Sequence, residues 1–284
     1  MQQSALSTIG LPLALAIIML GLGLHLRLDD FRRILKQPKA MLVGLACQAL
    51  LLPALCLGLS KLWGLPGSLA VGMMLLAASP GGITANLYSH LFKGDVALNI
   101  SLTAINSVTA IVSIPLIVNF SLLHFMGNQQ VIPLQFQKTL EVMLLILLPV
   151  GLGMLVHARF PAFAQRMDKP VKIASALVLV LMILLILQRE WALVVANFQQ
   201  VGSAALVFNL ASLLVGYGAG QLARLSEGQS RAIAFEIGIH NGTLAIYLAL
   251  AVLNDGGMAI PAAIYSLLMF CTAALFGFWV ARKG

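Results

Sequence analysis

The sequence contains little charge. Only 9% of its 284 residues are Asp, Glu, Lys or Arg, whereas soluble domains carry about 25%. Hydrophobic residues make up 60% of the chain, and the mean hydropathy is +0.98. Such a chain cannot cover an apolar core with a charged surface in water, which excludes an ordinary soluble domain. The sequence therefore predicts an all-α polytopic membrane protein embedded in a lipid bilayer.

The sequence also lacks the motifs of enzymes and ATP-driven pumps. It has no HExxH zinc motif, no GxSxG nucleophile elbow and no GxxxxGK[ST] phosphate loop. Its 3 cysteines lie in apolar segments without metal-ligand or disulfide spacing. We therefore expect that the chain is not an enzyme. The opening MQQSALST lacks the positive region of a signal peptide, so the first apolar run is counted as a span.

Long apolar runs fill most of the chain. A membrane span needs about 20 mostly apolar residues. Nine runs are candidates, namely Ile9–Leu26, Ala40–Leu62, Leu65–Leu91, Val96–Phe120, Leu134–Val156, Val171–Leu187, Val201–Leu222, Ala232–Leu253 and Met258–Val280. The sequence thus predicts nine transmembrane helices in a single transporter domain.

Basic residues predict the orientation of these spans. With the N-terminus outside, the cytoplasmic segments hold fourteen of the 17 Lys and Arg residues, namely Arg27, Arg32, Arg33, Lys36, Lys39, Lys93, Arg159, Arg166, Lys169, Lys172, Arg224, Arg231, Arg282 and Lys283. The outside segments hold the other three, Lys61, Lys138 and Arg189. The positive-inside rule then predicts a cytoplasmic C-terminus, and the compact chain is typical of a bacterial inner-membrane protein. The net charge of +8 is assigned to topology rather than to nucleic-acid binding.

Two predicted spans are interrupted. The third contains SPGGITAN at Ser79–Asn86, and the eighth contains GIHNG at Gly238–Gly242. Each could be a simple helix kink. However, the two interruptions hold the same position in spans one to four and six to nine, which predicts an inverted repeat with two broken helices. Repeat one would cover about 8–122, a linking span about 134–157, and repeat two about 170–282.

One acidic residue, Glu236, lies inside a predicted span. An acid at a span centre costs about 2.5–3.5 kcal/mol on insertion scales, so it is expected to be paired, protonated or functional. Neutral polar residues occur in the surrounding spans, namely Gln48, Asn86, Asn99, Thr103 and Asn241. Each could simply form an interhelical hydrogen bond. Together with the acid and the two breaks, they favour a site for a hard alkali cation, which takes oxygen ligands.

These residues carry a family resemblance. The motif PGGxxxN at Pro80–Asn86, the following KGDVALN at Lys93–Asn99, and the later ExGxxN at Glu236–Asn241 resemble the bile acid:sodium symporter family over nearly the whole chain. The resemblance implies a panel domain, a core domain with two crossing broken helices, and sodium-coupled transport of a bile acid-like anion or small carboxylate by alternating access.

The resemblance also implies two sodium sites. The first would comprise Ala85, Asn86, Asn99, Thr103 and Glu236. The second would comprise Gln48, Glu236, the backbone carbonyls of Ile237 and Ile239, and the side chain of His240. This chain departs from the family pattern at three positions: Ala85 and Asn99 replace the usual serines, and His240 replaces the usual glutamine.

His240 leaves three interpretations open. Its ring could turn toward Asn241 or backbone oxygens, leaving a second sodium site intact. The second site could instead be lost or proton-linked, because imidazole nitrogen is a poor ligand for sodium and histidine exchanges protons near neutral pH. The ring could also contact the substrate directly. The transported ions are accordingly one or two sodium ions, or a proton.

The breaks also indicate an anion site. Helix N-termini favour negative charge, so Thr84, Asn241 and Thr243, which flank the breaks, are the predicted substrate contacts. Alternative functions with the same fold are a proton-coupled or uncoupled organic anion carrier, an exporter, and a passive channel. The sequence does not choose the substrate, the direction of transport or the oligomeric state.

Overall fold

The computed structural model describes residues 10–127 and 136–282, and every regular element in these two ranges is a helix. In chain order the helices are α1 (Leu11–His25), α2 (Leu28–Lys36), α3 (Pro38–Ala46), the π-helix η2 (Cys47–Leu51), α4 (Leu52–Leu62), α5 (Gly67–Ala78), α6 (Ile83–Leu91), α7 (Val96–Met126), α8 (Phe136–Arg159), α9 (Pro161–Arg189), α10 (Trp191–Leu222), α11 (Glu227–Gly238), α12 (Gly242–Tyr247), the π-helix η3 (Leu248–Val252), the 3-10 helix η4 (Gly257–Ala259) and α13 (Ile260–Ala281).

The helices agree with the prediction of a polytopic membrane protein. Within the described ranges, 5 helical segments are long and apolar enough to cross a membrane by themselves, namely Pro38–Leu62, Val96–Met126, Pro161–Gln188, Trp191–Leu222 and Gly257–Ala281. The other predicted spans correspond to shorter apolar helices, because breaks divide the third and eighth. The predicted starts of the first and fifth, at Ile9 and Leu134, lie outside the described residues. The count of nine spans stays a prediction.

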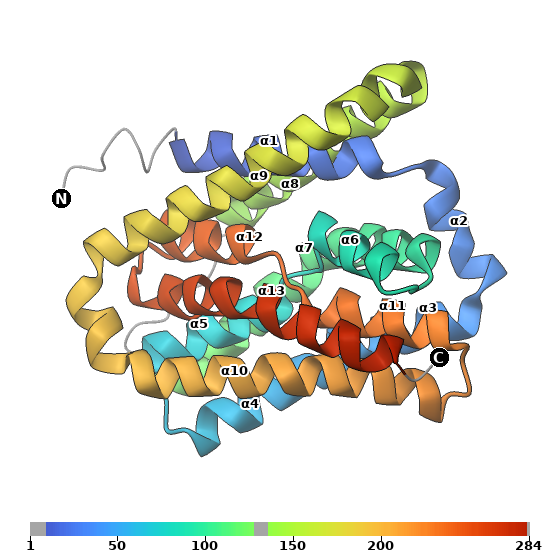
Figure 1. Cartoon of the computed structure of the whole chain (residues 1–284). Coiled ribbons are helices and arrows are strands. Elements are labelled where there is room, and N and C mark those ends of the chain that lie inside the picture. The colour runs from blue at the N-terminus through green and yellow to red at the C-terminus, as the bar shows by residue number, and fades with distance from the viewer. Residues whose placement is uncertain (1–9, 128–135, 283–284) are drawn as a thin grey trace.

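Two groups of helices pack side by side. Helices α1, α8 and α9 contact one another, while α5, α6, α7, α10, α11 and α13 form a larger group (Figure 1). Helix α1 approaches α8 closely, since a Cβ atom on Gly23 would lie 2.1 Å from the Val150 carbonyl oxygen and one on Gly153 would lie 2.4 Å from that of Leu20. The division into a panel and a core stays a prediction, for which α1, α8 and α9 are the candidate panel.

The two predicted breaks are present and touch each other. Helix α5 ends at Ala78 before α6 begins, and α11 ends at Gly238 before α12 begins. Between these ends, Gly81 and His240 form an isolated antiparallel bridge, and the Asn241 N–H donates to the Pro80 carbonyl at 2.9 Å. The chains run in opposite directions here, as an inverted repeat requires. The repeat itself and its boundaries stay predictions.

Short polar side chains fix the ends of the helices that carry the breaks. Ser226 begins α11 with a capping box, in which its hydroxyl accepts from the Gln229 N–H at 3.2 Å. Asn241 begins α12, since its Oδ1 atom accepts from the Leu244 N–H at 3.0 Å. At the end of α5, the Ser79 hydroxyl donates to the Leu75 carbonyl at 2.9 Å. These bonds satisfy backbone groups that a helix terminus otherwise leaves unpaired.

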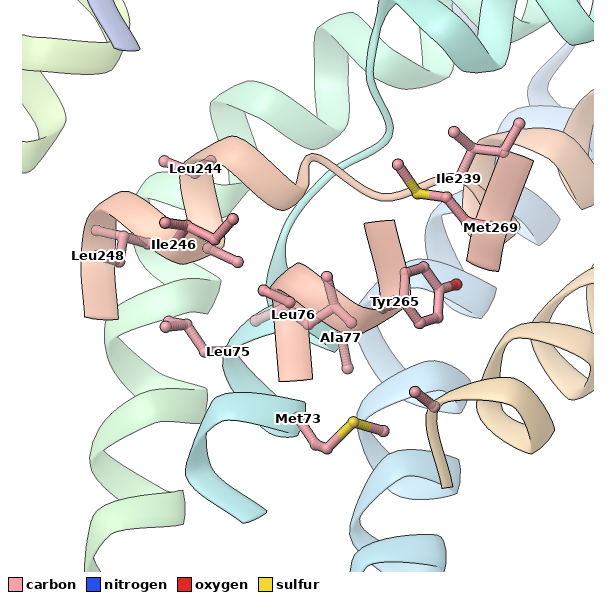
Figure 2. Packing of buried hydrophobic residues seen from close by; sticks show 14 of the residues in the cluster. Met73, Leu75, Leu76, Ala77, Ile239, Leu244, Ile246, Leu248, Tyr265 and Met269 are labelled. Atoms are coloured by element: carbon pink, nitrogen blue, oxygen red, sulfur yellow. The ribbon is translucent and has the colours of Figure 1, made fainter. Parts of the chain in front are cut away.

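A dense apolar core surrounds the breaks. Figure 2 shows buried side chains of α5 among those of α12, η3 and α13, including Met73, Leu75, Leu76, Ala77, Leu244, Ile246, Leu248, Tyr265 and Met269. In lipid the hydrophobic effect does not drive helices together, so close packing and hydrogen bonds hold them. Small residues permit this approach where α10 meets α11: a Cβ on Gly216 would lie 2.8 Å from the Ala234 Cα atom.

This contact predicts different effects for two glycines of α10. Gly216→Val would force a side chain into the Ala234 backbone and is expected to lower the free energy of unfolding by about 1–3 kcal/mol. Gly218→Val is the matched control, since a Cβ at Gly218 meets nothing within 4 Å. Thermal unfolding of the two purified variants in detergent measures the difference. Equal melting temperatures would show that α10 and α11 do not pack at Gly216.

Candidate functional site

The carboxylate of Glu236 lies inside the protein, on α11 just before its break. The residue is 0% exposed. Its Oε2 atom accepts from the Thr103 hydroxyl at 2.6 Å, and its Oε1 atom accepts from the Asn106 side-chain amide at 3.1 Å. Among the described residues, no Lys or Arg forms an ion pair with it. The site therefore has a buried acid with neutral hydrogen-bond donors and no protein counter-charge.

The basic residue nearest in sequence is occupied elsewhere. Arg231, which the charge pattern assigned to the cytoplasmic segment before the eighth span, is 3% exposed. Its guanidinium donates to the Val280 carbonyl at 3.0 Å and to the Phe92 carbonyl at 3.4 Å, and lies 3.7 Å from Glu227. The side chain thus joins the C-terminal ends of α6 and α13 to α11. It leaves the charge of Glu236 unneutralised.

The first break brings backbone beside Glu236. A Cβ atom on Gly81 would lie 2.5 Å from the Oε2 atom of Glu236 and 2.7 Å from its Oε1 atom. Only glycine leaves room for the carboxylate at this point. The neighbouring Gly82 is different, since a Cβ atom there would have only ordinary contacts, the nearest at 3.8 Å from the Thr84 hydroxyl. The sequence PGG therefore combines one glycine required by the acid with one that is not sterically constrained.

One face of α7 supplies three polar side chains to this region. Asn99, Thr103 and Asn106 recur at helical spacing. The Asn99 amide donates to the Ala232 carbonyl at 2.7 Å, and its Oδ1 atom is buried without a hydrogen-bond partner. Asn99 and Thr103 were predicted, whereas Asn106 was missed. The same spacing, continued by one turn, would have found Asn106.

The other predicted members of the first ion site lie on α6. Asn86 is 8% exposed, and both polar atoms of its side chain are buried without a hydrogen-bond partner. Ala85 is fully buried beside it. Helix α6 begins directly after Gly82 and packs against both α7 and α11. Unpaired buried polar atoms are costly, so Asn86 is a group still lacking a ligand or partner.

The members of the predicted second ion site meet at the first break. The Gln48 side-chain amide, on the π-helix η2, donates to the Ala77 and Ser79 carbonyls at 3.0 and 3.1 Å. The His240 Nδ1 atom lies 3.0 Å from the same Ser79 carbonyl. A carbonyl can only accept, so Nδ1 carries a proton. The Gln48 Oε1 and His240 Nε2 atoms are buried without partners.

Backbone carbonyls at the end of α11 complete that region. Ile237 and Ile239, whose carbonyls were predicted as ligands, are both 0% exposed. The carbonyl between them, on Gly238, accepts from the Asn209 amide and the Tyr265 hydroxyl, each at 2.8 Å. The prediction did not include Asn209 or Tyr265. Nothing in the local sequence of α10 or α13 marks them, because their partner lies on another helix.

The His240 ring is held between aromatic side chains. It stacks on Phe208 with ring centroids 5.9 Å apart and planes at 7°, and its centroid lies 5.5 Å from that of Tyr265. With its Nδ1 bond to Ser79, the ring has one fixed orientation. The ring therefore faces a backbone oxygen and also lines the cavity beside the breaks, and its role in a second sodium site stays a prediction.

A cavity of about 300 Å³ adjoins the two breaks. The three predicted substrate contacts, Thr84, Asn241 and Thr243, all line it. Its other walls are mainly apolar and come from α1, α6, α9 and α13, with Ile18, Met19, Leu22, Ile83, Leu87, Ala176, Leu179, Val180, Met269 and Phe270. No charged residue is among the described residues that form the lining. The cavity therefore offers a few polar groups at one end of an apolar space.

Two broken helices that meet inside a helical bundle, next to a buried acid and a cavity, are typical of secondary membrane transporters. A model of the Sodium Bile acid symporter family matches residues 12–197, and the chain belongs to that family. Members of this family are symporters rather than enzymes. The matched range includes the first break and α7, while Glu236 and the second break follow it.

Similar proteins extend the match to the whole chain. The "Probable sodium/metabolite cotransporter BASS1, chloroplastic" of Arabidopsis thaliana is 28% identical over 93% of this chain and 65% of its own length. The "Uncharacterized sodium-dependent transporter YocS" of Bacillus subtilis is 25% identical over 95% of this chain and 82% of its own. The human "Ileal sodium/bile acid cotransporter" is 27% identical over 98% of this chain and 80% of its own length. The chain thus spans less than two thirds of the length of the Arabidopsis protein.

The glycine pair at the first break gives a direct test of the site geometry. Gly81→Ala places a methyl group against the Glu236 carboxylate and is expected to destabilise the protein by about 1–3 kcal/mol. Gly82→Ala, one residue away, is expected to stay within about 0.5 kcal/mol. Both melting temperatures are measured in potassium chloride. A Gly82→Ala variant as unstable as Gly81→Ala would mean that the carboxylate does not lie where the structure places it.

Proposed function

We propose that the protein is a sodium-coupled symporter of an organic anion that works by alternating access. The observation that carries this proposal is the buried Glu236 carboxylate, which has two neutral donors and no cationic partner among the described residues. A buried charge without a counter-charge is unfavourable, so the site favours a cation from solution. The names of the Arabidopsis, Bacillus and human relatives, which all refer to sodium, support the same ion.

The residues around Glu236 suit sodium. Sodium is a hard cation that prefers carboxylate, amide, hydroxyl and carbonyl oxygens. The side-chain oxygens of Asn86 and Asn99 are buried without partners, so they can bind an ion without breaking a hydrogen bond. Thr103 has one hydroxyl proton and two acceptors in reach, Glu236 at 2.6 Å and the Asn99 carbonyl at 3.1 Å. Turning its proton to Asn99 frees its oxygen lone pairs for the ion.

We propose that one sodium ion, rather than two, binds in each cycle. In the second predicted site, the Gln48 amide and the His240 Nδ1–H both point at the Ser79 carbonyl. Both side chains are thus turned toward a carbonyl at the first break, and their N–H groups cannot bind a cation. The free atom of the ring, Nε2, is a nitrogen and therefore a poor sodium ligand.

The cavity supports an anionic substrate with an apolar body. Thr84, Asn241 and Thr243 provide polar groups beside the breaks, and the first N–H groups of α6 have no carbonyl partner within the helix. The remaining walls are aliphatic or aromatic. The names of the relatives, which include metabolite and bile acid cotransporters, agree with an organic solute.

Ion and substrate would be coupled through the breaks. At the crossing of the two breaks, Gly81 lies against Glu236, whereas its neighbour Gly82 lines the cavity. His240 and Asn241 lie opposite them, in the second break. An ion that orders this crossing also completes the cavity wall, so each ligand raises the affinity for the other. The cavity lies between α1 and α9 on one side and the breaks on the other. Rocking of these groups would open it to alternate sides of the membrane.

The orientation follows the basic residues. The connections from α1 to α3, α8 to α9 and α10 to α11, and the end of α13, lie at one end of the bundle (Figure 1). We propose that this end faces the cytoplasm of a bacterium, with the membrane as the inner membrane.

The experiment that tests the function is a comparison of sodium with potassium. Wild-type protein in detergent is expected to melt several degrees higher in sodium chloride than in potassium chloride, because an ion bound only by the folded state adds stability. Glu236→Gln is expected to abolish this difference. Glu227→Gln, which removes an exposed carboxylate from the same helix, is the matched control and should retain it.

The outcomes separate the competing functions. Equal melting temperatures of the wild type in both salts would contradict sodium coupling and favour a proton-coupled or uncoupled carrier. If Glu236→Gln stops sodium-driven solute uptake into proteoliposomes, a passive channel is excluded, since a channel should conduct without the carboxylate.

The number of ions can be tested at His240. The wild-type melting temperature, measured across a sodium titration, should fit a single binding event. His240→Gln places an amide oxygen where the imidazole stood and is expected to produce a steeper, cooperative titration. A wild-type titration that already shows two cooperative ions, unchanged by His240→Gln, would contradict one-ion coupling.

A further inference from the structure

Helix α2 lies across one end of the bundle. It connects α1 to α3 and runs across the direction of α4 and α10 (Figure 1). Its inner side packs on α7 and α3, with Phe31 against the main core. The chain between α1 and α2 is extended at Leu26, so α2 turns sharply away from the direction of α1. Its axis therefore lies near the plane of the membrane surface.

The outer side of α2 combines leucine with basic residues. Leu28 is 70% exposed and Leu35 is 82% exposed. Arg32 lies between them at helical spacing, with its side chain 73% exposed, and Lys36 is exposed one turn further on. Two large leucines that are mostly exposed among the described residues thus flank an arginine on one face. That combination is typical of helices in the membrane interface.

The charge of this segment is positive. Arg27, Arg32, Arg33, Lys36 and Lys39 lie in or beside α2, against Asp29 and Asp30. The Asp30 carboxylate is bound locally, since it accepts from the Arg27 N–H at 2.7 Å. Asp29 pairs with Arg32 at 3.2 Å, but both side chains are exposed, and an exposed pair is weak. The outer side thus keeps an excess of positive charge.

We propose that α2 docks on the anionic headgroups of the membrane leaflet at its end of the bundle. Leu28 and Leu35 would enter the acyl boundary, while Arg32 and Lys36 would contact lipid phosphates. Charge complementarity selects this partner, because an anionic leaflet attracts clustered Lys and Arg beside membrane helices. A protein partner would have to cover two leucines within a basic surface that lies in the headgroup region.

The docking has a consequence for movement. Helix α2 contacts α7, which carries Thr103 and Asn106, and is joined to α1 only through the extended residues near Leu26. Lipid that holds α2 therefore also holds the group of helices that contains the breaks. Helix α1, which lines the cavity, packs mainly on α8 and α9 instead.

The test measures binding of lipid to the purified full chain. Phosphatidylglycerol or phosphatidylcholine is titrated into detergent micelles, and the melting temperature is recorded in potassium chloride. Phosphatidylglycerol should raise the melting temperature of the wild type more than phosphatidylcholine does. Arg32→Gln combined with Lys36→Gln should weaken apparent phosphatidylglycerol affinity by roughly 25-fold, from about fivefold for each basic residue. Leu28→Ser combined with Leu35→Ser should weaken the binding of both lipids.

The control lies at the opposite end of the molecule. Lys61 is an exposed lysine at the end of α4, on the side away from α2 (Figure 1), so Lys61→Gln should keep the wild-type response. Higher potassium chloride should weaken the phosphatidylglycerol response of the wild type, because salt screens surface charge. The proposal is overturned if the variant with Arg32→Gln and Lys36→Gln responds to phosphatidylglycerol like the wild type. It is also overturned if Lys61→Gln weakens that response as much as this variant does, or if salt does not change the response of the wild type.

Discussion

The contact between the two helix breaks organises the rest of this structure. It consists of the hydrogen bond from the Asn241 N–H to the Pro80 carbonyl and the bridge between Gly81 and His240. Backbone that leaves a helix inside a membrane must find other partners, because lipid offers none. Each break supplies partners for the other. On one side of this contact lies the carboxylate of Glu236, and on the other lies the cavity.

Much of this arrangement could be predicted from the sequence, because it depends on residues that are unusual inside a membrane. The two breaks, Glu236 and the polar positions of α7 are visible as glycine, proline and acid in apolar runs. Thr84, Asn241 and Thr243 were chosen only because they flank the breaks, yet the structure brings all three to one cavity. Helix N-termini that meet at one point necessarily bring their first side chains together.

Other features could not be read from the sequence, for two different reasons. Asn209 and Tyr265 bind the Gly238 carbonyl, and such a partnership depends on how α10 and α13 pack rather than on any local pattern. The contacts of Arg231 with the Phe92 and Val280 carbonyls likewise depend on how the helices pack. Helix α2 was missed because a search for apolar runs of about 20 residues passes over a short amphipathic helix. The number of membrane spans depends on how broken helices are counted.

The hydrogen bonds of Glu236 also bear on how an ion-coupled carrier can return without its ion. A fixed arginine partner would neutralise the carboxylate permanently, and a transported cation would then have little to gain. With no partner at all, the buried charge would be too unfavourable for the empty state. Thr103 and Asn106 provide an intermediate solution, since neutral donors stabilise a carboxylate without cancelling its charge. Arg231 is held by the Phe92 and Val280 carbonyls rather than by the acid, so in the proposed mechanism the carboxylate is available to the ion that is carried.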